Sequence, residues 1–337
     1  DVREDLARRD FTINAMAYNE KEGLVDPFGG QADLQSGILR AVGVPHQRFT
    51  EDALRILRLY RFAARFGFSI DPPTARAAQE LCAHLDCVSV ERIEEELAKL
   101  LTAPAPAAYL DKKILLVILP ELSSEALAAA KPVVDACPAG EQALPIRLAA
   151  LLLSLGEDGT RRTLRRLRCS NACIEETAVL VREVVSGVPG AFSSDTNRAI
   201  PSPALLPAAT GSHPSGRSSE KLPARPPVSL NIYARRLLGK YNLCTVQRLA
   251  ALGTALQPEH AADFAALSEL AERLDADGVC CRVSQLAVNG RDLMAAGVPA
   301  GPGIRKVLEA LLDGVIREEY PNERQALLAA VQQLAAS

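Results

Sequence analysis

Hydrophobic residues recur every three or four positions between residues 46 and 186 and again between 229 and 337. This spacing places apolar side chains on one face of a helix, so it predicts helices rather than strands. In the helix predicted over 90–101, Ile93, Leu97, Leu100 and Leu101 face inward, and Glu91, Glu94, Glu95 and Glu96 are expected to face water. The other predicted helices cover 5–17, 48–62, 72–84, 105–119, 123–135, 141–155, 159–167, 171–186, 230–239, 245–254, 259–275, 283–296, 303–319 and 322–335.

Two short apolar runs near the start of the chain predict strands instead. Residues 24–26 run into the turn sequence Pro-Phe-Gly-Gly, and residues 38–42 form the second run. A hairpin of two strands is too small to be stable alone, so we expect it to belong to a larger sheet with strands upstream of residue 1. The chain starts without a methionine, and we expect a fragment of a longer protein.

Residues 187–228 break the helical pattern. The segment is rich in Ser, Pro, Ala and Gly, from which a packed core cannot be built. We therefore predict a disordered insertion that separates two sets of helices.

Composition narrows the class of protein. With 337 residues, 48% of them hydrophobic and 23% charged, the chain has room for two or three globular modules. The net charge of −3 gives no chain-wide footprint for nucleic acid, so any such surface must be local. Eight Cys without a CxxC pair and four scattered His argue against a zinc site. No apolar run is long enough to span a membrane, and we expect a cytoplasmic protein with reduced thiols.

One polar stripe lies on the otherwise apolar helix predicted over 48–62. Thr50 is the expected N-cap, with Glu51 and Asp52 in the first turn, and Asp52, Arg55 and Arg58 are spaced by three. A carboxylate accepts and a guanidinium donates hydrogen bonds, which matches the amine and ring nitrogen of adenine and cytosine. Guanine and uracil present the reverse pattern. An Asp–Arg pair could thus select A and C without a template; the alternative is an ordinary ion pair on a buried helix.

Two further groups suit nucleotide or RNA contacts. Arg8, Arg9, Asp10 and Asn14 fall within two helical turns, where Arg suits phosphate and Asp or Asn suits ribose hydroxyls; the alternative is a solvated helix face. Near the end of the chain, Gly297 is predicted to follow one helix as a C′ residue and Pro302 to begin the next. Arg305 and Lys306 beside that helix N-terminus suit RNA phosphate, and a plain helix–turn–helix connection is the alternative.

Taken in order, Arg-Arg-Asp-x-x-x-Asn (8–14), Asp-Pro-x-Gly (26–29) with Asp33, and Glu-Asp-x-x-Arg-x-x-Arg (51–58) resemble the class II tRNA nucleotidyltransferase and bacterial poly(A) polymerase family. The resemblance is dense over residues 1–100, and residues 285–325 are similar to the tail of CCA-adding enzymes from Firmicutes. It implies a mainly α protein in which the C-terminal remnant of an α/β nucleotidyltransferase head precedes an all-helical neck, body and tail. The implied domains are head 1–45, neck 46–105, body 106–186, insertion 187–228, and a tRNA-binding body and tail 229–337.

The resemblance also implies an activity, substrates and residue roles. The family adds C, C and A to the acceptor end of tRNA from CTP and ATP with Mg²⁺. A poly(A) polymerase, a partial CCA-adding enzyme and a non-catalytic helical RNA-binding module remain alternatives. The implied roles are ribose and phosphate binding by Arg8, Arg9, Asp10 and Asn14; a hinge at Asp26, Pro27, Gly29 and Asp33; base reading by Asp52 and Arg55, assisted by Arg58; and RNA contact by Arg61, Arg305 and Lys306.

The sequence departs from the family at the metal site. The family carries a Gly-Ser loop and an Asp-x-Asp pair before the arginine motif, and neither precedes Arg8 here. Asp1 and Asp5 are not substitutes, because they lie in the lead-in to a predicted helix rather than on a strand. We therefore expect no metal ligands in this chain, and no nucleotidyl transfer by the chain alone.

Overall fold

Residues 2–21, 23–185 and 229–336 are described by the computed structural model, and they form two units, one on each side of segment 186–228. The predicted insertion at 187–228 lies outside the described residues, and the other domain boundaries stay predictions. The described chain is mainly helical with a small α/β part, which confirms the predicted fold class. No described helix is long and apolar enough to cross a membrane.

The described strands of the first unit are only two or three residues long. The elements are α1 (Val2–Ala7), β1 (Ala17–Asn19), β2 (Gly23–Val25), α2 (Gly30–Ser36), β3 (Ile38–Leu39) and β4 (Ser69–Ile70). β1 pairs antiparallel with β2, placing Tyr18 opposite Leu24, and β3 pairs in parallel with β4. The predicted hairpin between 24–26 and 38–42 is therefore wrong, because each run has another partner.

The helix predicted over 5–17 is also wrong beyond its start, since α1 ends at Ala7. The backbone that follows is recruited by the segment around β3. Thr12 N donates to Arg40 O at 2.9 Å, and Val42 N donates to Asp10 O at 3.1 Å. These long-range hydrogen bonds replace helical ones over residues 10–12, and this exchange places Asp10 in the interior.

The single helix predicted over 48–62 is two helices, α3 (Pro45–Glu51) and α4 (Leu54–Phe66). Asp52 between them is extended, with φ −151° and ψ 102°, and its side chain accepts a hydrogen bond from Leu54 N at 3.1 Å. An Asp side chain that binds nearby backbone in this way competes with helical bonding. Thr50 is consequently not an N-cap: it lies inside α3, where its hydroxyl donates to His46 O.

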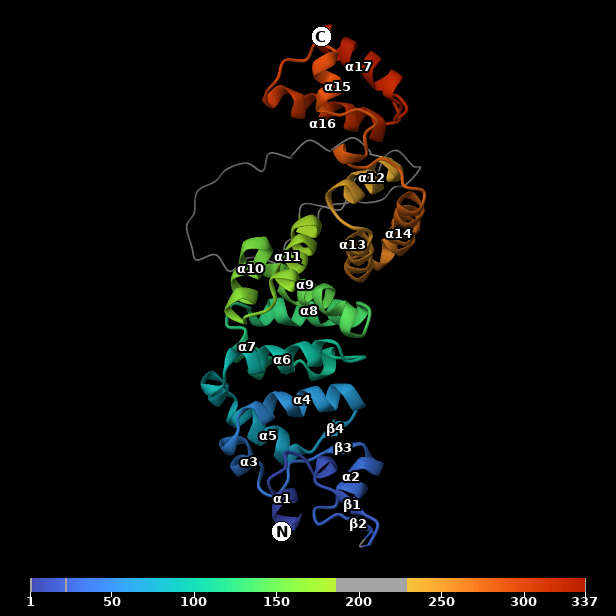
Figure 1. Cartoon of the computed structure of the whole chain (residues 1–337). Helices are drawn as coiled ribbons and strands as arrows, with labels where there is room; N and C mark the ends of the chain where they lie inside the picture. The colour runs from blue at the N-terminus through green and yellow to red at the C-terminus, as the bar shows by residue number, and fades with distance from the viewer. Residues whose placement is uncertain (1, 22, 186–228, 337) are drawn as a thin grey trace, which may run out of the picture. The chain divides into compact units, whose positions relative to one another are not determined.

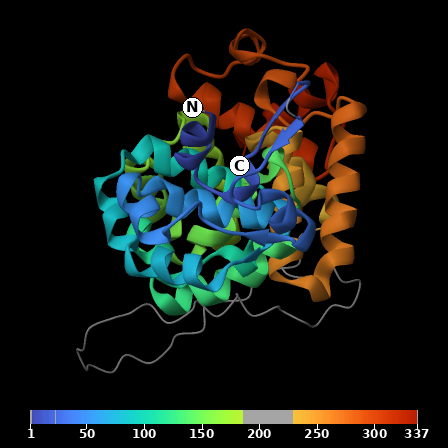
Figure 2. The ribbon, with the colours of Figure 1, turned by 90° about the horizontal axis from the view of Figure 1, so that it is seen from below.

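The remaining helices of the first unit follow the predicted periodicity. They are α5 (Pro72–Glu80), α6 (Val90–Leu101), α7 (Lys112–Ile118), α8 (Ser124–Ala136), α9 (Leu144–Leu152), α10 (Gly156–Arg166) and α11 (Asn171–Val185), with 3₁₀ turns at Cys82–Cys87, Ala107–Tyr109, Glu141–Ala143 and Leu153–Leu155. Figure 1 shows them in successive layers, with α4 beside α6, and Figure 2 views the same unit from its N-terminal end. As predicted, Ile93 and Leu97 of α6 are buried.

A buried arginine ties three of these layers together. Arg147 of α9 is fully buried, and its guanidinium donates to the carbonyls of Leu101, Ala103 and Cys137. Burial lowers the pKa of Arg147. Because the three acceptors end α6 and α8 or follow them directly, one side chain fixes where these helices stop.

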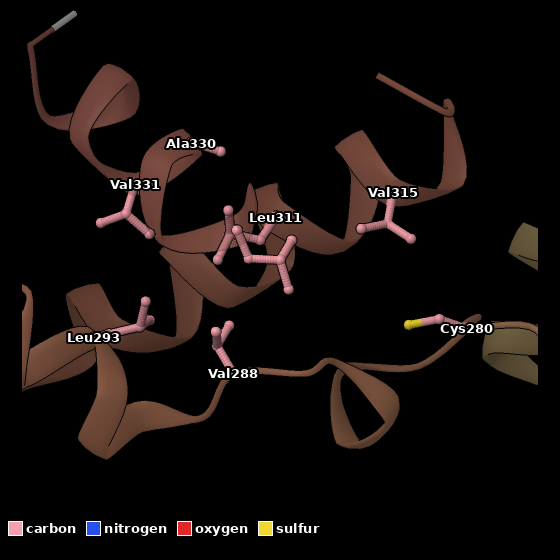
Figure 3. Packing of buried hydrophobic residues seen from close by; sticks show 8 residues of the cluster. Cys280, Val288, Leu293, Leu311, Val315, Ala330 and Val331 are labelled. Atoms are coloured by element: carbon pink, nitrogen blue, oxygen red, sulfur yellow. The ribbon is translucent and has the colours of Figure 1, made fainter. Parts of the chain in front are cut away.

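The second unit consists of α12 (Leu230–Lys240), α13 (Leu243–Leu256), α14 (Ala261–Ala276), α15 (Gly290–Ala295), α16 (Pro302–Ile316) and α17 (Arg324–Ala336), with 3₁₀ turns at Pro258–His260 and Val283–Gln285. Leu293, Leu311, Val315 and Val331 pack in the core that joins α15, α16 and α17 (Figure 3). Gly297 follows α15 with φ +96°, and Pro302 begins α16, so both predicted punctuation residues are confirmed.

Candidate nucleotide-binding site

Asp10 is the centre of a buried polar cluster between the α/β part and α4. Its Oδ2 accepts from Arg58 Nε at 2.9 Å and Nη2 at 2.7 Å. Its Oδ1 accepts from Phe11 N at 2.9 Å and from Asn14 Nδ2 at 3.1 Å. A carboxylate offers about four acceptor positions, and these four bonds fill them. The structure thus brings Asp10, Asn14 and Arg58 together as the motifs suggested, but Asp10 has no acceptor left for a ribose hydroxyl.

The cluster continues from Arg58 into α6 through a buried carboxylate. Glu96, whose side chain is 5% exposed, lies 2.5 Å from Arg61 Nε and 3.6 Å from Arg58 Nη1, as ion pairs. Glu96 Oε2 and Arg61 Nε are buried, and their contact is an ion pair rather than a hydrogen bond. Burial lowers the pKa of Arg61, and the Glu96 charge opposes that shift.

Two sequence predictions are corrected by this cluster. Glu96 was expected to face water and is buried. Arg61 was expected to contact RNA, but its side chain is 9% exposed, is paired with Glu96, and lies over the Phe62 ring with its guanidinium carbon 3.8 Å from the ring centroid. A guanidinium enclosed in this way cannot reach a phosphate, so Arg61 instead supports the packing of α4 against α6.

Asp52 has a more open environment than Asp10. Its Oδ1 accepts from Leu54 N at 3.1 Å, and its Oδ2 accepts from Arg92 Nη2 of α6 at 2.9 Å. The side chain is 32% exposed. These two bonds use half of the acceptor positions of a carboxylate, so Asp52 can accept two more hydrogen bonds without losing a partner.

Arg55 also makes hydrogen bonds to the protein and keeps N–H donors that these bonds do not use. Its Nη1 donates to Arg48 O at 3.0 Å and to Glu51 Oε2 at 2.9 Å, and its Nη2 donates to Arg8 O at 3.0 Å. A guanidinium has five N–H donors, so Nε–H and one Nη2–H have no acceptor among the described residues. The bond to Arg8 O also brings the arginine motif beside the start of α4.

The side chains of Arg8 and Arg9 lie on the surface near this junction. Arg8 is exposed, and Arg9 makes an exposed ion pair with Asp5 at 3.1 Å. Exposed pairs of this kind are worth less than about 1 kcal/mol, so an anionic ligand can displace them. Of the predicted phosphate ligands, these two are accessible, and the contact between Arg55 and Arg8 O links them to the predicted base-reading residues.

Of the four residues predicted to form a hinge, Asp26, Gly29 and Asp33 make hydrogen bonds at a corner of the chain before and within α2. Asp26 accepts from Gly30 N at 2.7 Å and from Gln31 N at 2.9 Å, which caps α2. Gly29, two residues after Pro27, has φ +73°, a conformation that favours glycine. Asp33 is buried and accepts from Thr12 Oγ1 at 2.7 Å. Movement at this corner stays a prediction.

Sequence reasoning missed the residues that support these groups from other elements. Arg40 bridges Asp33 at 3.1 Å and Asp71 at 2.6 Å, and its pKa is raised chiefly by the hydrogen bond with Asp33. Arg92 and Glu96 of α6 support Asp52 and Arg58. The i,i+4 spacing of Arg92 and Glu96 was a usable signal, because it places both on one face of α6.

The predicted RNA contacts of the tail lie in the second unit. Arg305 is exposed and pairs with Glu309 at 2.8 Å, and Lys306 is exposed beside the first turn of α16. Both side chains are accessible to a large ligand. Their role stays a prediction.

The part of the chain that the structure describes does not fit a catalytic metal centre. It contains no group of three or more His, Cys, Asp or Glu side chains that could hold an ion. A two-metal phosphoryl-transfer site needs such a carboxylate cluster, so no reaction step is assigned to a metal held by these residues. Among the described residues, the eight cysteines form no disulfide.

Three family models match successive parts of the chain. Residues 1–40 match the poly A polymerase head domain, residues 67–125 match a probable RNA and SrmB-binding site of polymerase A, and residues 229–331 match a putative tRNA nucleotidyltransferase domain 2. The first two flank α3 and α4, which lie between the matched ranges. The third falls within the second unit.

Full-length comparisons give one consistent result. The chain is 32% identical over 99% of its length to the CCA-adding enzyme of Limosilactobacillus fermentum, covering 72% of that protein. It is 30% identical over 97% of its length to the CCA-adding enzyme of Geobacillus thermodenitrificans, covering 71%. The crystal structure of Bacillus stearothermophilus CCA-adding enzyme in complex with CTP superposes on all of the chain with a TM-score of 0.76 and 26% identity, covering 75% of that structure.

Proposed function

Because the chain belongs to the CCA-adding enzyme family, a family of nucleotidyltransferases, we propose that it takes part in adding C, C and A to the 3′ ends of tRNA, with CTP and ATP as substrates. The observation that carries the proposal is the set of unused hydrogen-bonding positions at the junction of α3 and α4. Two acceptor positions on Asp52 and two donors on Arg55 remain open there, beside the accessible Arg8 and Arg9.

We assign base selection to Asp52 and Arg55. The exocyclic amine of cytosine or adenine would donate to Asp52, and the adjacent ring nitrogen would accept from Arg55. Guanine and uracil would turn a carbonyl toward Asp52 and an N–H toward Arg55, leaving both protein groups opposed by a like partner. A well-formed bidentate contact discriminates between bases by about 1–3 kcal/mol, or roughly 5- to 150-fold in affinity.

The remaining polar residues are assigned to orientation. Arg8 and Arg9 would contact phosphate oxygens, and Asn14 keeps its carbonyl oxygen for the ribose while its amide donates to Asp10. Arg58 assists by holding Asp10 rather than by contacting the base. Arg305 and Lys306 would contact tRNA phosphates, and the corner at Asp26 would adjust when the nucleotide changes. These residues bind and orient; the metal-dependent step is not assigned to them.

Equilibrium titration of the whole chain with CTP, ATP, UTP and GTP tests the proposal. We expect CTP and ATP to bind about tenfold or more tightly than UTP and GTP. Asp52→Ala should bring the four affinities together, because the acceptor for the exocyclic amine is removed. Asp86→Ala is the matched control, since Asp86 is an exposed aspartate of the same unit without a partner among the described residues. Equal affinities for all four nucleotides in the unmodified chain would overturn the proposal.

A poly(A) polymerase is the second candidate. Two of the three matching family models are named for poly(A) polymerase. Both activities use ATP, so ATP affinity does not separate them. Relative affinity for CTP does, because a poly(A) polymerase has no use for cytosine. We expect CTP to bind within about tenfold of ATP, and a much weaker CTP affinity would favour this second candidate.

A further inference from the structure

The second unit contains a small open recess beside the C-terminal ends of α12 and α14. It encloses about 270 Å³ of space that is open to solvent, and its lining includes Leu238, Asp275, Gly278, Cys281, Arg282 and Gln285. None of these residues is assigned to nucleotide or tRNA binding above. Ligand sites for drug-sized molecules enclose about 300–1,000 Å³, so this recess suits a molecule much smaller than a nucleotide.

Two of the lining residues carry hydrogen-bond donors that the protein holds in place. Arg282 Nε donates to Leu238 O at 3.2 Å, and Arg282 Nη2 donates to Tyr241 O at 3.1 Å. Gln285 Oε1 accepts from Cys281 N and from Arg282 N, both at 2.9 Å. These bonds orient both planar groups. They leave Arg282 Nη1 and Gln285 Nε2 without an acceptor among the described residues.

The Asp275 carboxylate, in the last turn of α14, is the acceptor of the recess. The residue is exposed, and its side chain makes no hydrogen bond or ion pair with the part of the chain that the structure describes. The negative end of the α14 dipole adds to its charge, which favours a cation beside it. Burial raises the pKa of the neighbouring Cys281 thiol, so this thiol stays protonated and adds no charge.

The combination of these groups limits the class of ligand. Arg282 would attract a phosphate or a simple carboxylate, but Asp275 would repel it, and a simple amine would meet the reverse. None of the lining residues, all of which lie in the described part of the second unit, is aromatic, so a nucleobase would lack a stacking surface. A molecule that carries both charges matches the recess.

We propose that the recess is a binding site for a small zwitterion, a free α-amino acid. Its carboxylate would accept hydrogen bonds from Arg282 Nη1 and Gln285 Nε2, and its ammonium would donate to the Asp275 carboxylate. A guanidinium is suited to a carboxylate because its donors lie in one plane. The proposal does not depend on the nucleotide selection that is assigned to the first unit.

The position of the recess gives ligand binding a structural effect. Cys281 lines the recess, whereas the preceding residue, Cys280, lies in the core that joins α15, α16 and α17 (Figure 3). Asp275 belongs to α14, which packs against α12 and α13. A bound amino acid would therefore connect the two helical groups of the second unit. Because a ligand that binds only the folded state stabilises it, binding should raise the thermal midpoint of unfolding.

Titration of the whole chain with L-alanine, propionate and L-alaninamide tests the proposal. Propionate lacks the ammonium group, and L-alaninamide lacks the carboxylate. We expect L-alanine to bind with a Kd of about 1 mM, which is within reach of so small a ligand, and to raise the thermal midpoint at saturating concentration. Propionate and L-alaninamide should each bind about tenfold or more weakly, because each leaves one charged group of the recess without a partner.

Two substitutions and a matched control locate the site. Asp275→Asn should weaken L-alanine binding by about tenfold or more without weakening propionate, because only the ammonium contact is lost. Arg282→Lys should weaken both ligands, and its urea midpoint shows whether α12 keeps its C-terminal support. If Arg282→Lys unfolds the second unit, Asp275→Asn decides alone. Asp277→Asn is the control, because Asp277 is an exposed aspartate that does not line the recess, and it should leave both affinities unchanged.

Four results would each overturn the proposal. The first is a lack of saturable L-alanine binding up to about 100 mM. The second is propionate binding as tight as that of L-alanine, which would make the recess an anion site. The third is tighter binding of cytidine than of L-alanine, which would make it a nucleobase site. The fourth is an equal loss of L-alanine affinity in Asp277→Asn and Asp275→Asn, which would assign the effect to general surface charge.

Discussion

Asp10 and Asp52 are two aspartates that contact α4, and they have opposite surroundings. The Asp10 side chain is 8% exposed and its acceptor positions are filled by Arg58, Asn14 and Phe11 N. Asp52 is 32% exposed and half filled. Buried polar groups must be satisfied by the protein itself, whereas a recognition group must keep capacity for its ligand. The difference shows that the same residue type can stabilise the fold, as Asp10 does, or keep free acceptor positions, as Asp52 does.

The largest expected effect comes from a substitution that leaves a buried charge next to this cluster without its closest partner. Arg61→Leu leaves Glu96 enclosed with only the more distant Arg58 as a cationic partner. Removing one partner of a buried ion pair is expected to lower the free energy of unfolding by about 3 kcal/mol. Urea unfolding followed by circular dichroism measures this loss.

The control for that substitution is the double variant Arg61→Leu with Glu96→Leu. Replacing both charges with apolar side chains of similar size removes the unpaired carboxylate, so most of the lost stability should return. A double variant as unstable as Arg61→Leu alone would show that the loss came from packing around Arg61, including its contact with Phe62.

A second group of buried charges, around Arg40, should respond in the same direction, with a smaller loss of stability. Arg40→Met removes the guanidinium that bridges the buried carboxylates of Asp33 and Asp71. Both acids keep other donors, Thr12 and Thr74, so we expect a loss of about 2 kcal/mol in the free energy of unfolding. Thermal unfolding measures it. A loss close to zero would mean that Arg40 acts as an exposed surface charge.

The smallest expected effect concerns pH and two neighbouring acids of α6. Burial, followed by the charge of Glu95, raises the pKa of Glu94. A raised pKa in the folded state means that the ionised form costs stability above that pKa, and that the cost disappears as the pH falls below the unfolded value. Glu94→Gln should therefore stabilise the chain at neutral pH, by about 0.5 kcal/mol after solvent screening, with no gain in acid.

Glu95→Gln provides the opposite sign as a control. The hydrogen bond from Lys99 lowers the pKa of Glu95. Its contribution to stability is present above the unfolded pKa and is lost as the pH falls through the lowered value. Urea midpoints between pH 4 and pH 8 should thus shift in opposite directions for the two variants at the upper end. Shifts of the same sign would contradict the assignment of burial as the cause for Glu94.

Local sequence rules predicted much of the fold, but they did not predict which residues of other elements hold the side chains of the candidate site. The spacing of apolar residues predicted the buried face of α6 correctly, because Ile93 and Leu97 lie on that face and are buried. It could not predict the break at Asp52, where a side chain binds the backbone, nor β4 and its pairing with β3, in which partners such as Ile38 and Ser69 are far apart in sequence. The charge pattern of this helix also does not show which of its four glutamates, Glu91, Glu94, Glu95 and Glu96, is buried.

The candidate site was predictable where a motif is contiguous and unpredictable where elements meet. Arg55 and Arg58 were identified from spacing alone, and the structure places both beside the Arg8–Asn14 segment. Which aspartate is saturated depends on partners 40 or more residues away, Arg92 for Asp52 and Arg58 for Asp10. The spacing of residues within α4 does not carry that information.

The most direct measurement of the contrast is a pair of isosteric substitutions, Asp10→Asn and Asp52→Asn, each examined for unfolding free energy and for affinity to the four nucleotides. Asp10→Asn is expected to lower the free energy of unfolding by about 2 kcal/mol, because Arg58 loses its buried acceptor, and to keep the preference for CTP and ATP. Asp52→Asn is expected to change stability by less than about 1 kcal/mol and to abolish the preference. If Asp10→Asn abolishes the preference while Asp52→Asn retains it, the division between a structural and a recognising aspartate is contradicted.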